Sequence, residues 1–191
     1  IPLKKNTAQG TILVFNLKWG MRVKSNIVLI GMPGCGKSTA GVLLAKVLGK
    51  NFMDTDVVMH AREGRFLQQI LDGEGIAAFL DRECRAVLSI QAKNTVIATG
   101  GSVVYRARAM EHLKKDGLIV YIRLPYEEIV ARIHNLSSRG VALRPGETLE
   151  DEYTRRCPLY EQYAELILDG GKTTLEQSVD RLRLLIKDAG Y

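Results

Sequence analysis

The chain has 191 residues, of which 46% are hydrophobic and 25% charged, a balance typical of a soluble globular protein with one domain. No stretch comes near the roughly 20 consecutive apolar residues of a membrane-spanning helix, so we expect no membrane partner. The cysteines Cys35, Cys84 and Cys157 are widely spaced and show no metal-site spacing, which favours reduced thiols in a cytoplasmic protein.

The net charge of +6 comes almost wholly from residues 1–25, which carry five basic side chains and no acidic one. In the rest of the chain, 22 of the 27 basic side chains face 21 acidic ones. A near-neutral body does not favour nucleic acid, so we expect no nucleic-acid partner. We interpret residues 1–20 as an extension or edge element outside the catalytic fold, and residues 21–191 as one domain.

After the extension, short apolar runs alternate with helical patterns, which is typical of a parallel sheet covered by helices. The pattern predicts an α/β fold of the three-layer αβα type, with a five-stranded parallel sheet. The expected strands are 26–30, 52–53, 95–99, 118–122 and 166–168. The expected helices are 38–48, 76–92, 106–115, 125–133, 149–163 with a break at Pro158, and 174–189. Before the helix 76–92, we expect a mostly helical stretch that is interrupted at Gly64 and around residues 72–75. The polar, arginine-bearing segment 135–147 is predicted to be a mobile lid.

The segment Gly31–Ser38 fits the pattern G-x-x-x-x-G-K-S, after a strand and before a helix. Its glycines let backbone N–H groups surround a phosphate at the N-terminus of the helix. Lysine in this motif reaches the β- and γ-phosphates, and the serine hydroxyl is a Mg²⁺ ligand. The sequence therefore predicts a fold of the P-loop NTPase type, with ATP and Mg²⁺ as cofactors. The nucleotide-binding residues expected here are Gly34, Cys35, Gly36, Lys37, Ser38 and Thr39, with Cys35 as a small loop filler rather than a nucleophile.

Three of the predicted strands end in polar or glycine-rich loops: Gly31–Ser38, Asp54–Asp56 and Gly100–Ser102. Ligands of open parallel sheets bind at the carboxyl ends of the strands. We therefore expect the three loops to meet in one crevice.

Several motifs together resemble the shikimate kinase family, a group of small P-loop kinases. They are the GMPGCGKST loop, Asp54-Thr55-Asp56, a Gly-x-x-x-Phe…Glu segment over Gly75–Glu83, Gly100-Gly101, and Arg156-Cys-Pro-Leu-Tyr160. The resemblance covers nearly everything from residue 26 to about residue 185. It implies transfer of a phosphoryl group from ATP to shikimate, giving shikimate 3-phosphate, a step towards aromatic amino acids.

On the acceptor side, the resemblance implies that Asp56 holds the substrate hydroxyl and orients or deprotonates it. Gly100 and Gly101 would offer backbone contacts, Glu83 would belong to the substrate pocket, and Arg156 would grip the substrate carboxylate. The chemistry agrees, because a carboxylate suits an attacking hydroxyl and arginine matches a carboxylate in bidentate geometry.

On the nucleotide side, the resemblance implies a place for Asp54 in the Mg²⁺ shell and for Arg132 against the adenine. An arginine of the lid would fold over the phosphates and act in catalysis with Lys37. Its spacing favours Arg139, while Arg144-Pro145 also looks like the family's Arg-Pro pair. The alternatives stay open: Asp54 or Asp56 could instead cap a helix, and Arg156 could be a surface charge.

Two residues depart from the family pattern. The family has arginine directly after the phenylalanine, where it helps bind the carboxylate, but here this position is Leu80. Arg82 is about 200° further around a helix and cannot simply replace it. The third glycine of the family is replaced by Ser102.

The hypothesis is thus a monomeric, ATP- and Mg²⁺-dependent kinase of a small carboxylated metabolite, with shikimate as the expected acceptor. Leu80 and Ser102 leave a different hydroxylated anion as the alternative. A non-catalytic nucleotide-binding module is the third possibility, although such a module has no need of Asp56.

Overall fold

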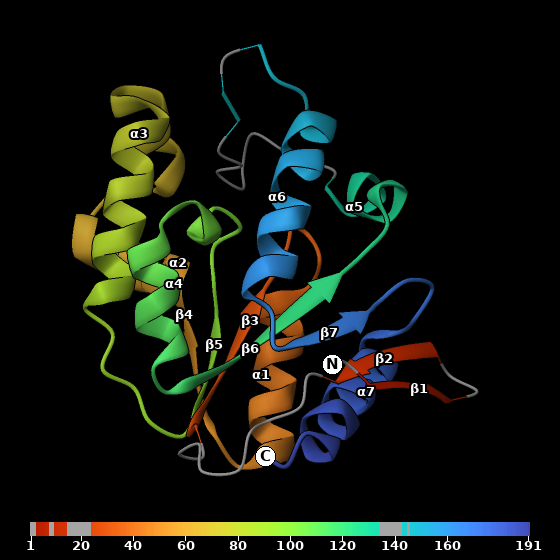
Figure 1. Ribbon diagram of the computed structural model, residues 1–191. Helices are drawn as coiled ribbons and strands as arrows, with labels where there is room; N and C mark the ends of the chain where they lie inside the picture. Colours follow the sequence, from red (N-terminus) through yellow and green to blue (C-terminus); the bar gives the residue numbers. More distant parts are fainter. Residues whose placement is uncertain (1–2, 8–9, 15–23, 134–142, 145) are drawn as a thin grey trace.

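The centre of the protein is a five-stranded parallel sheet with the order β4-β5-β3-β6-β7 (Figure 1). A computed structural model describes residues 3–7, 10–14, 24–133, 143–144 and 146–191. The strands are β3 (Asn26–Ile30), β4 (Asn51–Asp54), β5 (Thr95–Ala98), β6 (Gly117–Arg123) and β7 (Leu166–Asp169). The predicted α/β fold and its parallel sheet are confirmed.

Helices cover both faces of this sheet. α1 and α7 pack together on one face, whereas α4 and α6 lie on the other and α3 packs against α4 (Figure 1). α2 connects β4 to α3 and packs against both. The bounds are α1 (Lys37–Leu48), α2 (Thr55–Glu63), α3 (Leu67–Leu88), α4 (Ala107–Lys114), α5 (Tyr126–Arg132), α6 (Leu149–Tyr163) and α7 (Leu175–Asp188), with a 3-10 turn η1 (Val103–Tyr105) after β5.

The main hydrophobic core lies between the sheet and its helices. Every residue of β3 and β5 is buried, as expected for strands with helices on both faces. A smaller apolar cluster lies under α2 and α3, and its buried members are Met59, Ile70, Phe79, Leu80 and Ala86. The two cores leave the carboxyl ends of the strands open for polar loops.

The helix boundaries follow local backbone signals in two places. Gly49 ends α1 in the left-handed conformation with a φ of 63°, as predicted. α3 is interrupted at Gly75, which has a φ of 77° and a ψ of 174°, so the predicted break around residues 72–75 is also confirmed. The helix nevertheless begins before this break, at Leu67, and it ends at Leu88 rather than at residue 92.

The break predicted at Pro158 is wrong, because α6 runs through it to Tyr163. Proline removes one helical hydrogen bond and usually bends a helix. In α6, however, the buried side chains of Arg156 and Tyr160 hold the helix in the core on either side of the proline. Tertiary packing has overridden the local preference.

The N-terminal segment and the predicted lid are described only in part. β1 (Leu3–Thr7) and β2 (Gly10–Val14) form an antiparallel hairpin separate from the main sheet, with β2 beside β7 (Figure 1). Of the predicted lid, residues 135–142 and 145 lie outside the described residues, and Arg139 with them. In the described part of the chain, no helix is long and apolar enough to span a membrane.

The strand order brings the three expected loops together. β4, β5 and β3 are direct neighbours, and Asp54 of β4 and Leu29 of β3 both pair with Ala98 of β5. The loops that follow these strands therefore start at the same edge of the sheet.

Candidate active site

The phosphate-binding loop connects β3 to α1. Gly34 has a φ of 79°, and a Cβ there would come within 2.8 Å of an Ile133 side-chain carbon, so this position requires glycine. No side chain caps α1, whose N-cap is Gly36. The amides of its first turn are therefore available to an anionic ligand.

The Lys37 side chain is buried and bent over this loop. Its Nζ donates hydrogen bonds to the carbonyl oxygens of Gly31 and Met32, both at 2.9 Å, and lies 3.7 Å from Cys35 Sγ. Cys35 is itself buried, which agrees with its expected role as a filler of the loop. The ammonium group is thus held inside the loop by acceptors that a phosphate oxygen can replace.

The two aspartates after β4 have different surroundings. Asp54 Oδ1 accepts a hydrogen bond from the Asp56 amide at 2.9 Å, so Asp54 does cap α2, as one of the open alternatives stated. Asp56 does not cap the helix and instead lines the cavity described below. Burial raises the pKa of Asp56 to about 6; the charge of Asp54 adds to this rise and that of Lys37 opposes it.

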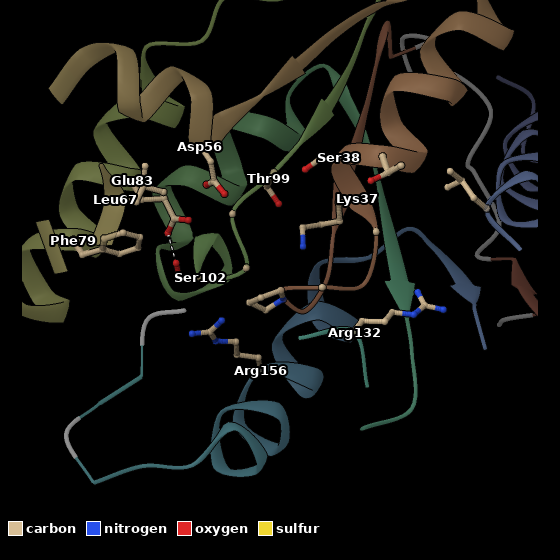
Figure 2. A pocket seen from close by; sticks show the side chains of 17 residues that line it. Lys37, Ser38, Asp56, Leu67, Phe79, Glu83, Thr99, Ser102, Arg132 and Arg156 are labelled. Carbon is tan, nitrogen blue, oxygen red and sulfur yellow. Dashed lines mark hydrogen bonds between the residues drawn. The ribbon is translucent and has the colours of Figure 1, made fainter. Parts of the chain in front are cut away.

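Opposite the loop, Glu83 of α3 meets the segment after β5. Ser102 Oγ donates a hydrogen bond of 2.8 Å to Glu83 Oε2, drawn as a dashed line in Figure 2. A Cβ on Gly100 would lie 2.1 Å from Glu83 Oε1, so only glycine fits between the carboxyl group and the backbone. Burial and the neighbouring Asp56 raise the pKa of Glu83 to about 7, while the Ser102 hydrogen bond, Arg156 and Lys37 oppose the rise.

Arg156 of α6 lines the side of the cavity that also holds Glu83 and Ser102, which we call the acceptor side (Figure 2). Its side chain is only 1% exposed. Its Nε donates to Glu152 Oε2 at 2.7 Å, and its guanidinium carbon lies 5.3 Å from the centre of the Tyr105 ring. Tyr160, one turn further along α6, donates to the Gly101 carbonyl at 2.6 Å. The alternative in which Arg156 is a surface charge is therefore wrong.

These groups surround one cavity of about 500 Å³ (Figure 2). Eleven of the expected site residues line it, namely Gly34, Gly36, Lys37, Ser38, Thr39, Asp56, Glu83, Gly100, Gly101, Arg132 and Arg156. Cys35 and Asp54 do not line it, and Arg139 lies outside the described residues. The predicted convergence of the three loops is thus confirmed.

Five further residues line the cavity that were not expected from the sequence: Pro33, Leu67, Phe79, Thr99 and Leu175. Pro33 and Thr99 could have been predicted, because they directly precede Gly34 and Gly100, two glycines expected in the site. Phe79 belongs to a quoted motif but reads as an ordinary core residue. Leu67 and Leu175 begin helices far away in the chain, and no local pattern connects them with the cavity.

Two oxygen donors suited to magnesium lie after β3 and at the end of β4, and of these Ser38 lines the cavity whereas Asp54 does not. The exposed Ser38 hydroxyl and the second carboxylate oxygen of Asp54 are hard oxygen ligands, and Mg²⁺ commonly takes only one or two protein ligands besides water and phosphate. Among the described residues, no group of three or more histidine, cysteine or acidic side chains could hold a metal ion. The residues present therefore suit an ion that arrives with a nucleotide.

Comparison with known sequences places this cavity in a family. The sequence profile of shikimate kinase matches residues 33–187. The chain belongs to the shikimate kinase family. A shikimate kinase of Psychrobacter arcticus is 37% identical over 160 residues, which are 82% of this chain and 86% of the relative. One of Methylococcus capsulatus is 34% identical over 165 residues, or 85% of this chain and 92% of the relative.

The fold agrees with solved shikimate kinases. The structure of the Acinetobacter baumannii shikimate kinase in complex with shikimate matches with a TM-score of 0.79 and 30% identity, over 87% of this chain and 95% of that one. The Aquifex aeolicus shikimate kinase matches with a TM-score of 0.71 and 30% identity, over 85% and 96% of the two chains. The kinase architecture thus extends over nearly all of this chain after the N-terminal hairpin.

Proposed function

We propose that this protein transfers the γ-phosphoryl group of ATP to a hydroxyl group of shikimate and so forms shikimate 3-phosphate. One observation carries the proposal: Lys37, Asp56 and Arg156 line the same cavity in a member of the shikimate kinase family. These side chains supply a phosphate-binding cation, a carboxylate for the attacking hydroxyl and an arginine for the acceptor carboxylate. The acceptor is the molecule that receives the phosphoryl group.

The proposed roles on the nucleotide side follow from the loop. Lys37 exchanges the carbonyls of Gly31 and Met32 for phosphate oxygens and stabilises the negative charge of the transferred group. Ser38 and Asp54 would hold a magnesium ion, which would supply further positive charge to the phosphates. Arg132 borders the nucleotide end, and we assign the covering lid arginine to Arg139.

The proposed roles on the acceptor side come from α2, the loop after β5 and α6. Asp56 accepts a hydrogen bond from the attacking hydroxyl and takes its proton at a carboxylate oxygen, while the new bond to the γ-phosphorus forms and the bond to the bridging oxygen breaks, so that ADP leaves. The backbones of Gly100 and Gly101 border the acceptor, and Arg156 orients it through its carboxylate. Little covalent chemistry is required of the protein, because phosphoryl transfer depends mainly on positioning and charge.

The test is ADP release with Mg-ATP and shikimate, measured beside a panel of other hydroxy acids, with the product identified by ³¹P NMR. We expect turnover with shikimate and formation of the 3-phosphate. Turnover of another hydroxy acid but not of shikimate would instead support the second candidate, a kinase of a different hydroxylated anion, which the replacement of the family's arginine by Leu80 favours. Nucleotide binding without turnover of any acceptor would support a non-catalytic module.

A further inference from the structure

Leu80 does not take part in the cavity. It is 9% exposed and packs in the small apolar cluster with Met59, Ile70 and Phe79, and it is not among the lining residues. The position at which the family carries a carboxylate-binding arginine is therefore part of the core here. A cation for the acceptor has to come from elsewhere.

Arg82 and Arg106 do not supply that cation. Arg82 forms ion pairs with Glu63 and Glu74, the second through a contact of 2.6 Å. Arg106 is paired with Asp81 at 2.8 Å. Neither arginine lines the cavity.

The cations that do line the cavity are unevenly distributed. Within the described residues they are Lys37, Arg132 and Arg156. Figure 2 shows Lys37 and Arg132 on the side of the phosphate-binding loop and Arg156 facing Ser102 and Glu83. In the described part of the molecule, Arg156 is thus the one cation on the acceptor side.

Glu83 is bonded to the Ser102 hydroxyl and not to an arginine at position 80, where the family carries one. Its side chain is 3% exposed, and no cationic side chain of the described residues lies within 4.0 Å of its carboxyl group. Instead, the buried Ser102 hydroxyl donates to Oε2, while Oε1 lies against Gly100. The two departures from the family pattern are therefore connected in space, since Ser102 satisfies the carboxyl group that Leu80 leaves without a cation.

We propose that Ser102 and Glu83 form a hydrogen-bonded pair in place of a second arginine, so that Glu83 contacts hydroxyl groups of the acceptor and Arg156 alone receives its carboxylate. This inference rests on the proposed function, because it concerns how the acceptor is held. Ser102 is a positioning residue that acts through Glu83. The pocket so formed suits a polyhydroxylated acid with a single carboxylate.

The pair makes acceptor binding depend on pH. When Glu83 is protonated, it can donate to an acceptor hydroxyl; when it is charged, it repels an acceptor carboxylate. The charged groups that act on Glu83 are Asp56 of α2, Lys37 of α1 and Arg156 of α6, and together with burial they put its pKa at about 7. The KM for the acceptor should therefore rise as the pH increases above neutrality.

The first experiment measures the KM for shikimate from pH 6 to 8.5 at saturating Mg-ATP, in the wild type and in Glu83→Gln. We expect a several-fold rise above pH 7 in the wild type and a flat profile in Glu83→Gln. Glu74→Gln is the matched control, because Glu74 is on the same helix but in exposed ion pairs, and its profile should follow the wild type. A flat wild-type profile, or the same rise in Glu83→Gln, would overturn the proposal.

Ser102→Ala and Leu80→Arg then test the pair and the missing arginine. The Ser102 hydrogen bond lowers the pKa of Glu83, so its removal should move the rise in KM to higher pH and leave the KM for ATP unchanged. Leu80→Arg should lower the KM for shikimate about tenfold by restoring a second cation. An unshifted profile in Ser102→Ala would contradict the assigned role, and this variant carries the test if Leu80→Arg does not fold.

A failure of the proposed function can be told apart from a failure of the pair. If the wild type does not phosphorylate shikimate, the pair is measured without any acceptor, by NMR titration of ¹³C-labelled glutamate carboxyl groups. Glu83 is assigned by the signal that disappears in Glu83→Gln. We expect its pKa to lie above the ordinary glutamate range and to rise further in Ser102→Ala; an ordinary value, or no change, refutes the pair.

Discussion

Apart from Arg132, the loop side of the cavity comes from one continuous stretch, residues 33–39, whereas the acceptor side is assembled from α2, α3, the segment after β5, and α6. On the loop side, Lys37 is satisfied by carbonyls only five and six residues away. On the acceptor side, the contact between Glu83 and Ser102 joins residues 19 apart, and Tyr160 reaches Gly101 across 59.

This difference has a consequence for function. A loop whose geometry is local retains its phosphate-binding chemistry whatever acceptor the enzyme uses. An acceptor wall made of distant side chains can change one contact at a time, as Leu80 and Ser102 have done, without disturbing the loop. Variants on the two sides should therefore separate acceptor binding from ATP binding.

The largest effect is expected for Asp56→Asn, at the junction of the two sides. Loss of the carboxylate that accepts the hydroxyl proton should reduce kcat by about 10²- to 10⁴-fold. Calorimetry should show ATP binding within about twofold of the wild type, because the loop itself is unchanged. Undiminished turnover would exclude Asp56 as the proton acceptor.

Arg156→Lys should have the next largest effect, confined to the acceptor side. Lysine keeps the charge but loses the planar, bidentate geometry, so the KM for shikimate should rise by about tenfold to a hundredfold with the KM for ATP unchanged. Arg155→Lys is the matched control: Arg155 pairs with Glu147 and Glu152 and does not line the cavity. Equal rises in both variants would mean that Arg156 acts through helix stability rather than through the acceptor.

Glu83→Gln should change how the free energy of unfolding depends on pH, and this effect ranks third in size. Between its ordinary pKa of 4.5 and its folded value of about 7, Glu83 keeps a proton in the folded state that the unfolded chain has lost. The free energy of unfolding of the wild type should therefore fall, relative to Glu83→Gln, as pH rises through this window, by up to about 3 kcal/mol.

Urea unfolding at pH 5, 6 and 7.5 measures this difference. Glu74→Gln serves again as the control, because hydrogen bonds from Arg65 and Arg82 lower the pKa of Glu74 and its contribution has the opposite sign. A constant difference between the wild type and Glu83→Gln at all three pH values would show that Glu83 carries its charge without penalty.

The sequence predicted the loop side well because its signals are local. A buried strand, a glycine pattern and a following helix stand next to one another, and the structure keeps them in that order. The acceptor side could be predicted only through family motifs, and these did not reveal that Ser102 bonds to Glu83. Which side chains meet across 19 residues depends on how α3 packs against the loop after β5, and no local pattern encodes this.

Pro158 shows the same limit for the fold. The local preference of proline predicted an interrupted helix, but buried residues on both sides keep α6 continuous. By contrast, the break before residue 76 in α3 was predicted from a local signal, because Gly75 takes a conformation that favours glycine.

The smallest effect is expected for Arg82→Ala, which tests whether this arginine supports the acceptor from outside the cavity. Its ion pairs with Glu63 and Glu74 are only partly shielded from water, so the loss in stability should be small. The KM for shikimate should not change, because Arg82 does not line the cavity and is paired with Glu63 of α2 and Glu74 of α3. A rise in that KM comparable to the rise in Arg156→Lys would mean that α3 does supply a second cation, and the acceptor side would then resemble the family more closely than its sequence indicates.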